Sequence, residues 1–154
     1  MQHELFTTRW FNTPGPTTLA GLRGDKRRVV VMLAFQMLCP GCVSTAIPQI
    51  KKVHETFSAD QVAVVGLHCV FEHHEAMTPI ALDAFLHEYQ VRFPVAIDEP
   101  SPGAPIPRTM AAYEMKGTPT LLVFDHDGNL RLNHFGHIDD LALGAVLGQL
   151  LSFS

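Results

Sequence analysis

The sequence is short of charge, of tryptophan and of long apolar runs. Charged residues make up 17% of the 154 residues, the net charge is −4, and there is one Trp. Without a basic excess the chain carries no field that would recruit nucleic acid or an anionic membrane surface. No run of about 18 apolar residues is present, which argues against a membrane-spanning helix. We therefore expect neither nucleic acid nor a membrane among its partners.

Cysteine is also scarce, with three in the chain. Residues 1–13 have neither the basic start nor the apolar stretch of a signal peptide, so we expect a cytoplasmic protein, or a periplasmic one if a leader was removed. Cytoplasmic thiols stay reduced, which argues against a structural disulfide framework. Two of the three, Cys39 and Cys42, form a Cys-X-X-Cys motif, and this indicates redox or metal chemistry.

The Cys-X-X-Cys motif lies at a predicted junction between a strand and a helix. Seven apolar residues, Val29–Phe35, predict a fully buried strand. A helical apolar pattern follows Cys39 directly and extends to about Ser58, with a kink expected at Pro48. A helix starting at Cys39 would point unpaired N–H groups and the positive end of its dipole at this sulfur, which favours the thiolate. Cys42, one turn further on, is placed to close a disulfide with Cys39.

Strands and helices alternate through the rest of the chain. Further strands are predicted at 61–68, 93–97, 118–124 and 129–135, a short edge strand at 9–11, and helices at about 78–89, 108–113 and 139–151. This order predicts an α/β fold in which a central mixed sheet of about five strands carries helices on both faces. We expect one domain over residues 1–154, with 1–27 as an N-terminal segment.

Four features together point to a known superfamily. They are the Cys39-Pro40-Gly41-Cys42 junction, Pro48 in the following helix, Gly117-Thr118-Pro119-Thr120 at the head of a late strand, and Asp125–Asn129 in the hairpin. With these features the chain, from about residue 17 to 151, resembles the thioredoxin-like superfamily, and within it the TlpA/redoxin-type thiol:disulfide oxidoreductases. The resemblance implies a three-layer α/β/α sandwich.

The resemblance also implies a role for each matching residue. Cys39 would attack a substrate disulfide and Cys42 would resolve the mixed disulfide, with the protein acting as a reductant and needing no cofactor or metal. The implied partners are a protein or small-molecule disulfide substrate and an upstream thiol reductant. Cis X-Pro bonds cost only about 0.5–1 kcal/mol, which agrees with the implied cis-proline at position 119. The implied substrate-binding residues are Pro40, Gly41, Thr118 and Pro119.

Three positions depart from the superfamily pattern. Leu38 stands where most relatives have a Trp before the first cysteine. Leu33 stands where many have an Asp or Asn close to the buried sulfur, and Pro48 comes one residue later than usual. Without a carboxyl at position 33, water or a group from another loop would have to deprotonate Cys42.

The loop after the second central strand is the distinctive feature of the chain. Ligands gather at the carboxyl ends of parallel strands, so this loop can reach the edge of the sheet where Cys39 lies. Its possible auxiliary residues are His68, Cys69, Glu72 and His73, of which His73 or Glu72 would be the missing base. In the simpler interpretation, which we favour, the first two are buried core residues and His73 is solvated.

Three other functions remain open from the sequence. A peroxiredoxin-like thiol peroxidase would oxidise Cys39 to a sulfenic acid and use Cys42 to resolve it, but such enzymes have Thr where this chain has Gln36. A copper or zinc carrier would use the same two cysteines with a histidine such as His68 or His137. A redox-inactive interaction module is the third.

Overall fold

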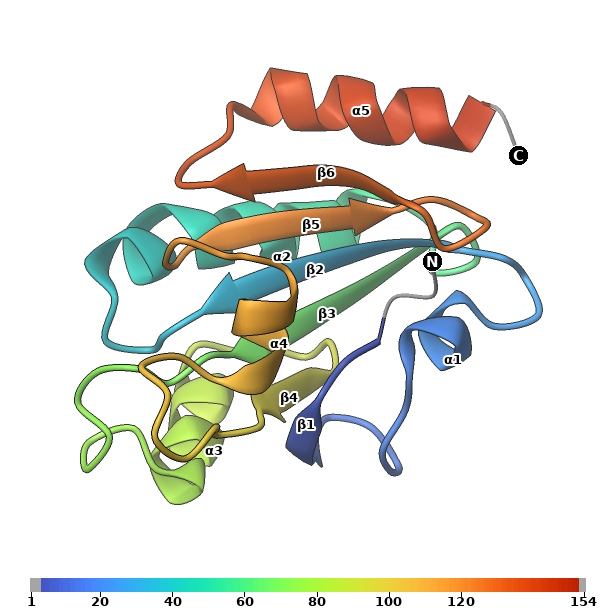
Figure 1. Ribbon diagram of the computed structural model, residues 1–154. Coiled ribbons are helices and arrows are strands. Elements are labelled where there is room, and N and C mark those ends of the chain that lie inside the picture. Colours follow the sequence, from blue (N-terminus) through green and yellow to red (C-terminus); the bar gives the residue numbers. More distant parts are fainter. Residues whose placement is uncertain (1–3, 153–154) are drawn as a thin grey trace.

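The structure is a computed structural model that describes residues 4–152. In chain order its elements are β1 (Thr7–Phe11), α1 (Leu19–Arg23), β2 (Val29–Phe35), a π-helical turn (Cys42–Ala46), α2 (Ile47–Thr56), β3 (Val62–His68), α3 (Pro79–Glu88), β4 (Val95–Asp98), α4 (Arg108–Ala112), β5 (Thr120–Phe124), β6 (Leu130–Phe135) and α5 (Asp140–Ser152) (Figure 1). Within the described range, none of the helices is long and apolar enough to cross a bilayer.

Six strands form one mixed sheet in the order β1-β4-β3-β2-β5-β6. β2, β3 and β4 are parallel, β1 and β5 run antiparallel to β4 and β2, and β6 runs antiparallel to β5. All seven residues of β2 are buried, as its central position requires. The sheet has one strand more than the predicted core of about five, because the N-terminal edge strand β1 pairs with β4, with an irregularity in the register between Thr7 and Arg9.

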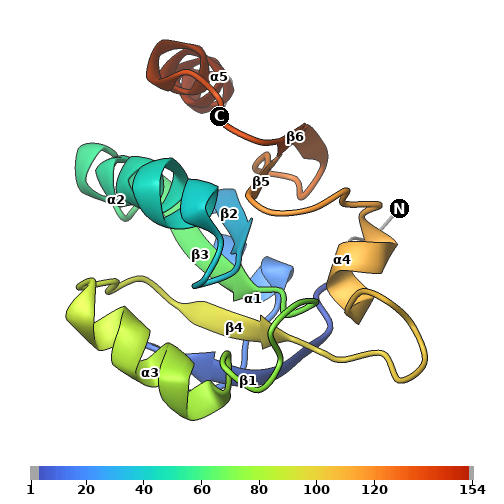
Figure 2. The ribbon, with the colours of Figure 1, turned by 90° about the vertical axis from the view of Figure 1, so that its left-hand side faces the viewer.

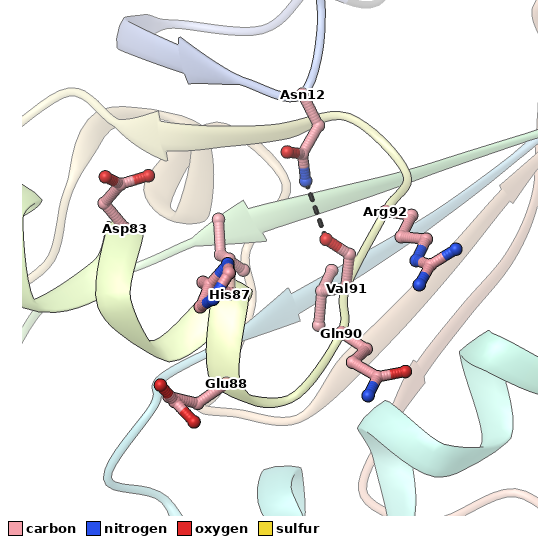
Figure 3. Close-up of a pocket in the computed structure, with 8 residues that line it drawn as sticks. Asn12, Asp83, His87, Glu88, Gln90, Val91 and Arg92 are labelled. Atoms are coloured by element: carbon pink, nitrogen blue, oxygen red, sulfur yellow. Dashed lines mark hydrogen bonds between the residues drawn. The ribbon is translucent and has the colours of Figure 1, made fainter.

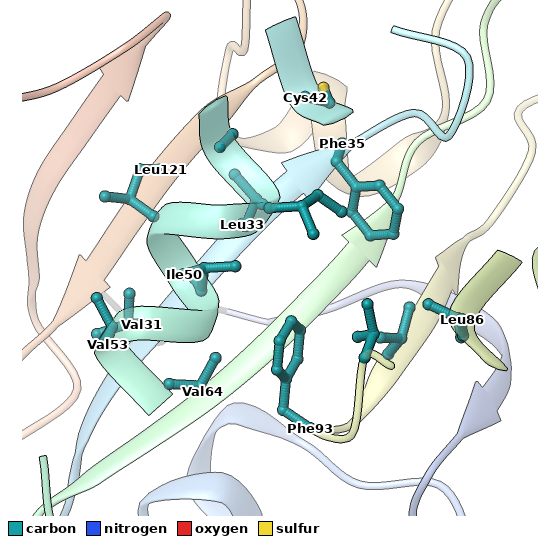
Figure 4. Packing of buried hydrophobic residues seen from close by; sticks show 14 of the residues in the cluster. Val31, Leu33, Phe35, Cys42, Ile50, Val53, Val64, Leu86, Phe93 and Leu121 are labelled. Carbon is teal, nitrogen blue, oxygen red and sulfur yellow. The ribbon is translucent and has the colours of Figure 1, made fainter. Parts of the chain in front are cut away.

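Helices cover both faces of the sheet, which confirms the predicted three-layer α/β/α arrangement (Figure 2). On one face α2, α3 and α5 pack on alternate residues of β2 such as Val31 and Leu33. On the other face α1 and α4 pack on the residues between them, such as Val30 and Met32. Figure 4 shows the first of these clusters, with Cys42 at its edge beside Phe35. The buried cysteine is thus part of the core.

Helix α1 lies in a stretch for which the sequence predicted no regular structure. The Thr18 hydroxyl accepts a hydrogen bond from Gly21 N at 3.0 Å and so caps its N-terminus. Gly24 ends it at φ +62°, a conformation that costs glycine little, and donates to Ala20 O. Five residues are too few to show a helical repeat, so only these capping residues marked the helix in the sequence.

The helix after the cysteines also differs from the prediction. Helical backbone begins at Pro40 instead of Cys39, passes through the π-helical turn, and continues as α2 to Thr56. In the π turn Ile47 N donates to Cys42 O, five residues back, where an α-helix would join residues four apart. The wider turn takes up the one extra residue before Pro48. Pro48 itself is the second residue of α2, directly after this turn.

Candidate functional site

Cys39 and Cys42 are both free thiols, and the fold exposes them unequally. Cys39 N donates to Gln36 O at 3.0 Å, and Cys39 O accepts from Val43 N at 3.1 Å, so the first cysteine sits where the turn after β2 becomes helix. Its side chain is partly exposed, whereas Cys42 has no exposed surface. An incoming disulfide can therefore reach Cys39 first.

The second segment of the site is the loop that leads into β5. Thr120 pairs with Ala34 across the β2–β5 ladder, which brings this loop to the end of β2 where the cysteines follow. The peptide bond between Thr118 and Pro119 is cis. Cys39 Sγ lies 3.6 Å from Thr118 O. Two segments 79 residues apart thus meet at the first sulfur.

The predicted substrate-binding residues lie around this contact. Pro40 is exposed and Gly41 is partly exposed. A Cβ on Gly41 would lie 3.7 Å from Pro119 Cδ, so the proline ring packs against the glycine backbone. Leu38, at the position where relatives have Trp, is 52% exposed beside Cys39. The surface next to the reactive sulfur is consequently apolar.

Burial dominates the acidity of Cys42. It is the largest cause of the rise that brings the pKa of Cys42 to about 12. A hydrogen bond to the Cys39 sulfur and the negative charge of Cys39 raise this pKa further. The backbone N–H of Gln36 and the hydroxyl of Thr118 act in the opposite direction and lower the pKa of Cys42, as hydrogen-bond donors to a thiolate do. Cys42 therefore keeps its proton near neutral pH in the reduced protein.

His68 lies in the buried end of β3 and not on the surface of the site. Its ring packs 5.1 Å from that of Phe35, and its Nε2 accepts a hydrogen bond from Met37 N at 3.2 Å. Burial lowers the pKa of His68 to about 4, so the ring is neutral near neutral pH. Since its Nε2 lone pair is used by Met37, His68 holds the turn before Cys39 in place and has no free acceptor there to act as a base.

Cys69, the third cysteine, is completely buried on the opposite face of the sheet from Cys42. Burial, the charge of Asp98 and a hydrogen bond to Asp98 raise the pKa of Cys69 well above its usual value. Asp98 in turn accepts hydrogen bonds from Thr109 N at 2.7 Å and Met110 N at 2.9 Å, and so caps α4. A protonated, enclosed thiol of this kind is a core residue.

Glu72 and His73 are exposed in the loop between β3 and α3. The same loop borders a cavity of about 350 Å³ with Val70 and Met77, opposite the proline-rich loop that follows Asp98. Since β2, β3 and β4 are parallel, this cavity lies at the same edge of the sheet as Cys39. A catalytic role of Glu72 or His73 stays a prediction, which the pH profile of a His73→Ala variant would test.

Sequence reasoning missed one residue of the site, Gln36. It is 3% exposed and stands three residues before Cys39. Its Oε1 accepts from Phe71 N at 3.2 Å, and its Nε2 donates to Thr118 Oγ1 at 3.4 Å. Its signal in the sequence is a polar residue directly after a fully apolar strand.

A second cavity, of about 500 Å³, lies at the C-terminal end of α3 (Figure 3). Asn12 closes one side of it by donating to Val91 O at 2.8 Å. It contains no cysteine and shares no residue with the site at Cys39. Among residues 4–152 no group of three or more His, Cys, Asp and Glu side chains is arranged to hold a metal ion.

Comparisons with known proteins agree with this geometry. The model of the AhpC/TSA family matches residues 8–133. The chain belongs to this family. A crystal structure of a thioredoxin-like superfamily protein is 58% identical, with a TM-score of 0.91, and 96% of this chain and 94% of that chain are covered. The comparison with curated proteins gives no match.

Two further solved structures are similar to this chain over nearly its whole length. The crystal structure of a thiol-disulfide isomerase from Corynebacterium glutamicum is 45% identical, with a TM-score of 0.90, covering 99% of this chain and 96% of that one. A thioredoxin-like protein in the oxidised form is 21% identical, with a TM-score of 0.77 and coverage of 97% and 93%, and shows the fold alone. The chain is therefore a thiol redox protein of the thioredoxin-like superfamily, as the resemblance implied.

Proposed function

We propose that the protein is a thiol:disulfide oxidoreductase that reduces substrate disulfides, with Cys39 as the attacking and Cys42 as the resolving cysteine. The observation that carries this proposal is the unequal exposure of two adjacent thiols: Cys39 reaches the surface, and Cys42 is wholly buried. An enzyme that forms and then resolves a mixed disulfide needs this asymmetry, because only the first sulfur has to meet the substrate.

The reaction would proceed in two exchanges. The Cys39 thiolate attacks one sulfur of the substrate disulfide, a bond forms between them, and the other substrate sulfur leaves as a thiolate. Cys42 then loses its proton to solvent and attacks Cys39 Sγ, which releases the second substrate thiolate and leaves a Cys39–Cys42 disulfide. Two electrons have passed from the dithiol to the substrate. An upstream dithiol reductant would restore the reduced pair.

The order of the two steps follows from the surroundings of Cys42. While Cys39 is a thiolate, its charge and its hydrogen bond both raise the pKa of Cys42. Once Cys39 is joined to a substrate its charge is gone, and these two contributions disappear with it. Deprotonation of Cys42 then becomes easier at the stage where its thiolate is needed.

The substrate we propose is a protein disulfide with apolar residues beside it. Leu38 is exposed next to Cys39. Phe135, 53% exposed, pairs with Thr120 at the head of β5 and packs over Gly117. The backbone of Thr118, whose carbonyl faces Cys39 Sγ, is placed to pair with an extended substrate chain.

Insulin reduction in the presence of dithiothreitol tests the function, with Cys39→Ser, Cys42→Ser and Cys69→Ala compared with the unchanged protein. We expect Cys39→Ser to be inactive, Cys42→Ser to accumulate a mixed disulfide with insulin, and Cys69→Ala to keep its activity. Full activity of Cys39→Ser would refute the proposal.

Equilibration of the cysteine pair in glutathione buffers tests the direction. A reductant should show a potential at or below the glutathione poise of about −220 to −260 mV, whereas a value near −120 mV would make the protein an oxidant. Hydrogen peroxide consumption by the reduced protein would instead support the peroxidase alternative. We expect none above the background of free thiols, because Gln36 replaces the Thr of such enzymes.

A further inference from the structure

We propose that Gln36 is a positioning residue for the resolving step: its buried side-chain amide turns the Thr118 hydroxyl so that this hydroxyl donates a hydrogen bond to Cys42 Sγ as its thiolate forms. The inference rests on the proposed oxidoreductase function and adds to it the group that stabilises the buried sulfur. It also accounts for Leu33, which leaves no carboxyl beside Cys42 from β2.

The orientation of the amide follows from its two partners. Phe71 N can only donate, so the atom of Gln36 that meets it at 3.2 Å must be the carbonyl oxygen Oε1. The other end of the amide, Nε2, then faces Thr118 Oγ1 at 3.4 Å. An amide nitrogen has only hydrogens to offer, so the hydroxyl oxygen is the acceptor in this contact.

This acceptor role fixes the direction of the hydroxyl proton. A threonine hydroxyl has one hydrogen and two lone pairs, and one lone pair is taken by Gln36. Its other hydrogen-bonding capacity, the hydrogen, remains for donation. Thr118 borders the cysteine pair, with its carbonyl oxygen 3.6 Å from Cys39 Sγ, and its hydroxyl lowers the pKa of Cys42, as a donor to that sulfur would. The chain Phe71 N–H to Gln36, Gln36 to Thr118 and Thr118 to Cys42 therefore points every donor toward the sulfur.

The site offers few other groups for this task. His68 uses its Nε2 for Met37 N. Cys69 and Asp98 form their own buried contact. The remaining donor to Cys42 is the backbone N–H of Gln36, which a side-chain substitution leaves in place. A side-chain variant at position 36 therefore separates the amide from the backbone contribution.

The chemical consequence concerns the second exchange alone. In the first exchange the Cys39 thiolate reacts and Cys42 stays protonated, so a donor to Cys42 contributes little. In the second exchange a negative charge develops on Cys42 Sγ before it passes to the leaving substrate sulfur. A hydrogen bond to a charged group is worth more than one to a neutral group, so losing it should slow this step by about tenfold or more.

Stopped-flow mixing of the reduced protein with excess dithiobis(nitrobenzoate) tests the inference. Attack by Cys39 releases one coloured thiolate at a rate that depends on reagent concentration. Resolution by Cys42 releases the second at a rate that does not. We expect Gln36→Leu to slow the second phase about tenfold or more and to leave the first within about twofold, and Thr118→Val to slow the second phase by a similar factor. Thr118→Ser, which keeps the hydroxyl, should restore the second phase.

Gln49→Leu is the matched control for Gln36→Leu. Gln49 is also a buried glutamine with two hydrogen bonds, to Ile138 O at 2.7 Å and to Asp140 Oδ1 at 2.8 Å. Its loss should lower stability without changing either phase. If Gln36→Leu slows the second phase no more than Gln49→Leu, or slows both phases alike, the positioning role is refuted.

Gln36→Glu keeps the shape of the side chain and reverses the hydrogen bond. An ionised carboxylate can still accept from Phe71 N, but it cannot donate to Thr118, so it would draw the hydroxyl proton away from Cys42. We expect a slower second phase, and a faster one would overturn the inference by making position 36 a base.

Release of one thiolate or none by the unchanged protein would overturn the proposed function as well, whereas two phases insensitive to position 36 would overturn this inference alone.

Discussion

Replacing His68 with glutamine should remove a large part of the acid sensitivity of the fold. Burial lowers the pKa of His68 to about 4, whereas in the unfolded chain it has its ordinary value of about 6.5. Above the unfolded value both states are neutral at this residue, and it contributes no pH dependence. Between these two pKa values His68 is protonated in the unfolded chain but neutral in the folded chain. The free energy of unfolding therefore falls as the pH falls.

The size of the effect follows from the same two values. Each pH unit in this range costs about 1.4 kcal/mol, so the free energy of unfolding should drop by about 3 kcal/mol between about pH 6.5 and about pH 4. Protonation would also remove the acceptor for Met37 N and release the turn before Cys39. Since the folded state takes up this proton only near about pH 4, the Met37 contact should be lost at the acidic end of the range over which stability falls.

Urea unfolding at about pH 7 and about pH 4.5 measures this drop in the wild-type protein and in His68→Gln. Glutamine keeps an acceptor for Met37 N but does not titrate in this range. We expect the variant to be less stable at neutral pH and to lose about 2–3 kcal/mol less on acidification. The pKa of Asp98 is raised mainly by burial, so this residue makes the fold more stable as the pH falls, opposite to His68. Both proteins contain Asp98, so its contribution cancels when they are compared. If both lose the same stability, His68 is not held neutral and the reasoning is wrong.

Three further outcomes test exposure and packing. Iodoacetamide should alkylate Cys39 alone in the folded, reduced protein, with Cys42 and Cys69 reacting only after denaturation, as mass spectrometry would show. Thr78→Ala should cost about 1 kcal/mol in urea unfolding, because the Thr78 hydroxyl caps α3; no change would mean that the cap is not formed in solution. Gly66→Ala should cost about 1–3 kcal/mol, since its Cβ would lie 3.1 Å from a valine methyl and 3.2 Å from a phenylalanine ring; a neutral result would mean that these side chains can move aside.

The fold was predictable where the hydrophobic pattern was long or strongly marked. β2 is a run of seven apolar residues and is buried throughout, and α3 has both a Thr-Pro start and an apolar stripe. The pattern failed where an element was short or its backbone irregular. Helix α1 has five residues, and the π-helical turn between Cys42 and Ala46 has no periodic signature of its own. The sign of this turn in the sequence is that Pro48 comes one residue later than usual.

The site was predictable as far as its named motifs reach. Cys39, Cys42 and the Thr118-Pro119 pair could be found because their spacing and their place at element ends are distinctive. Gln36 could not, because a single buried glutamine has no pattern and its importance depends on Phe71 and on the β5 loop. The sequence also left the surroundings of His68 open, since a histidine at the end of a strand can equally face solvent. The structure places it inside, bound to Met37 N.

The meeting of these groups depends on the register between β2 and β5. Ala34 pairs with Thr120, so the two residues before Thr120 fall beside the turn that follows Phe35. Shifting this pairing by one residue would turn every side chain of β5 to the opposite face of the sheet and carry Thr118 away from Cys39 and Gln36. Register is held firmly here because both faces of β2 are buried. The same apolar run that reads as an ordinary core strand therefore sets the positions of the thiols, the cis-proline loop and Gln36 relative to one another.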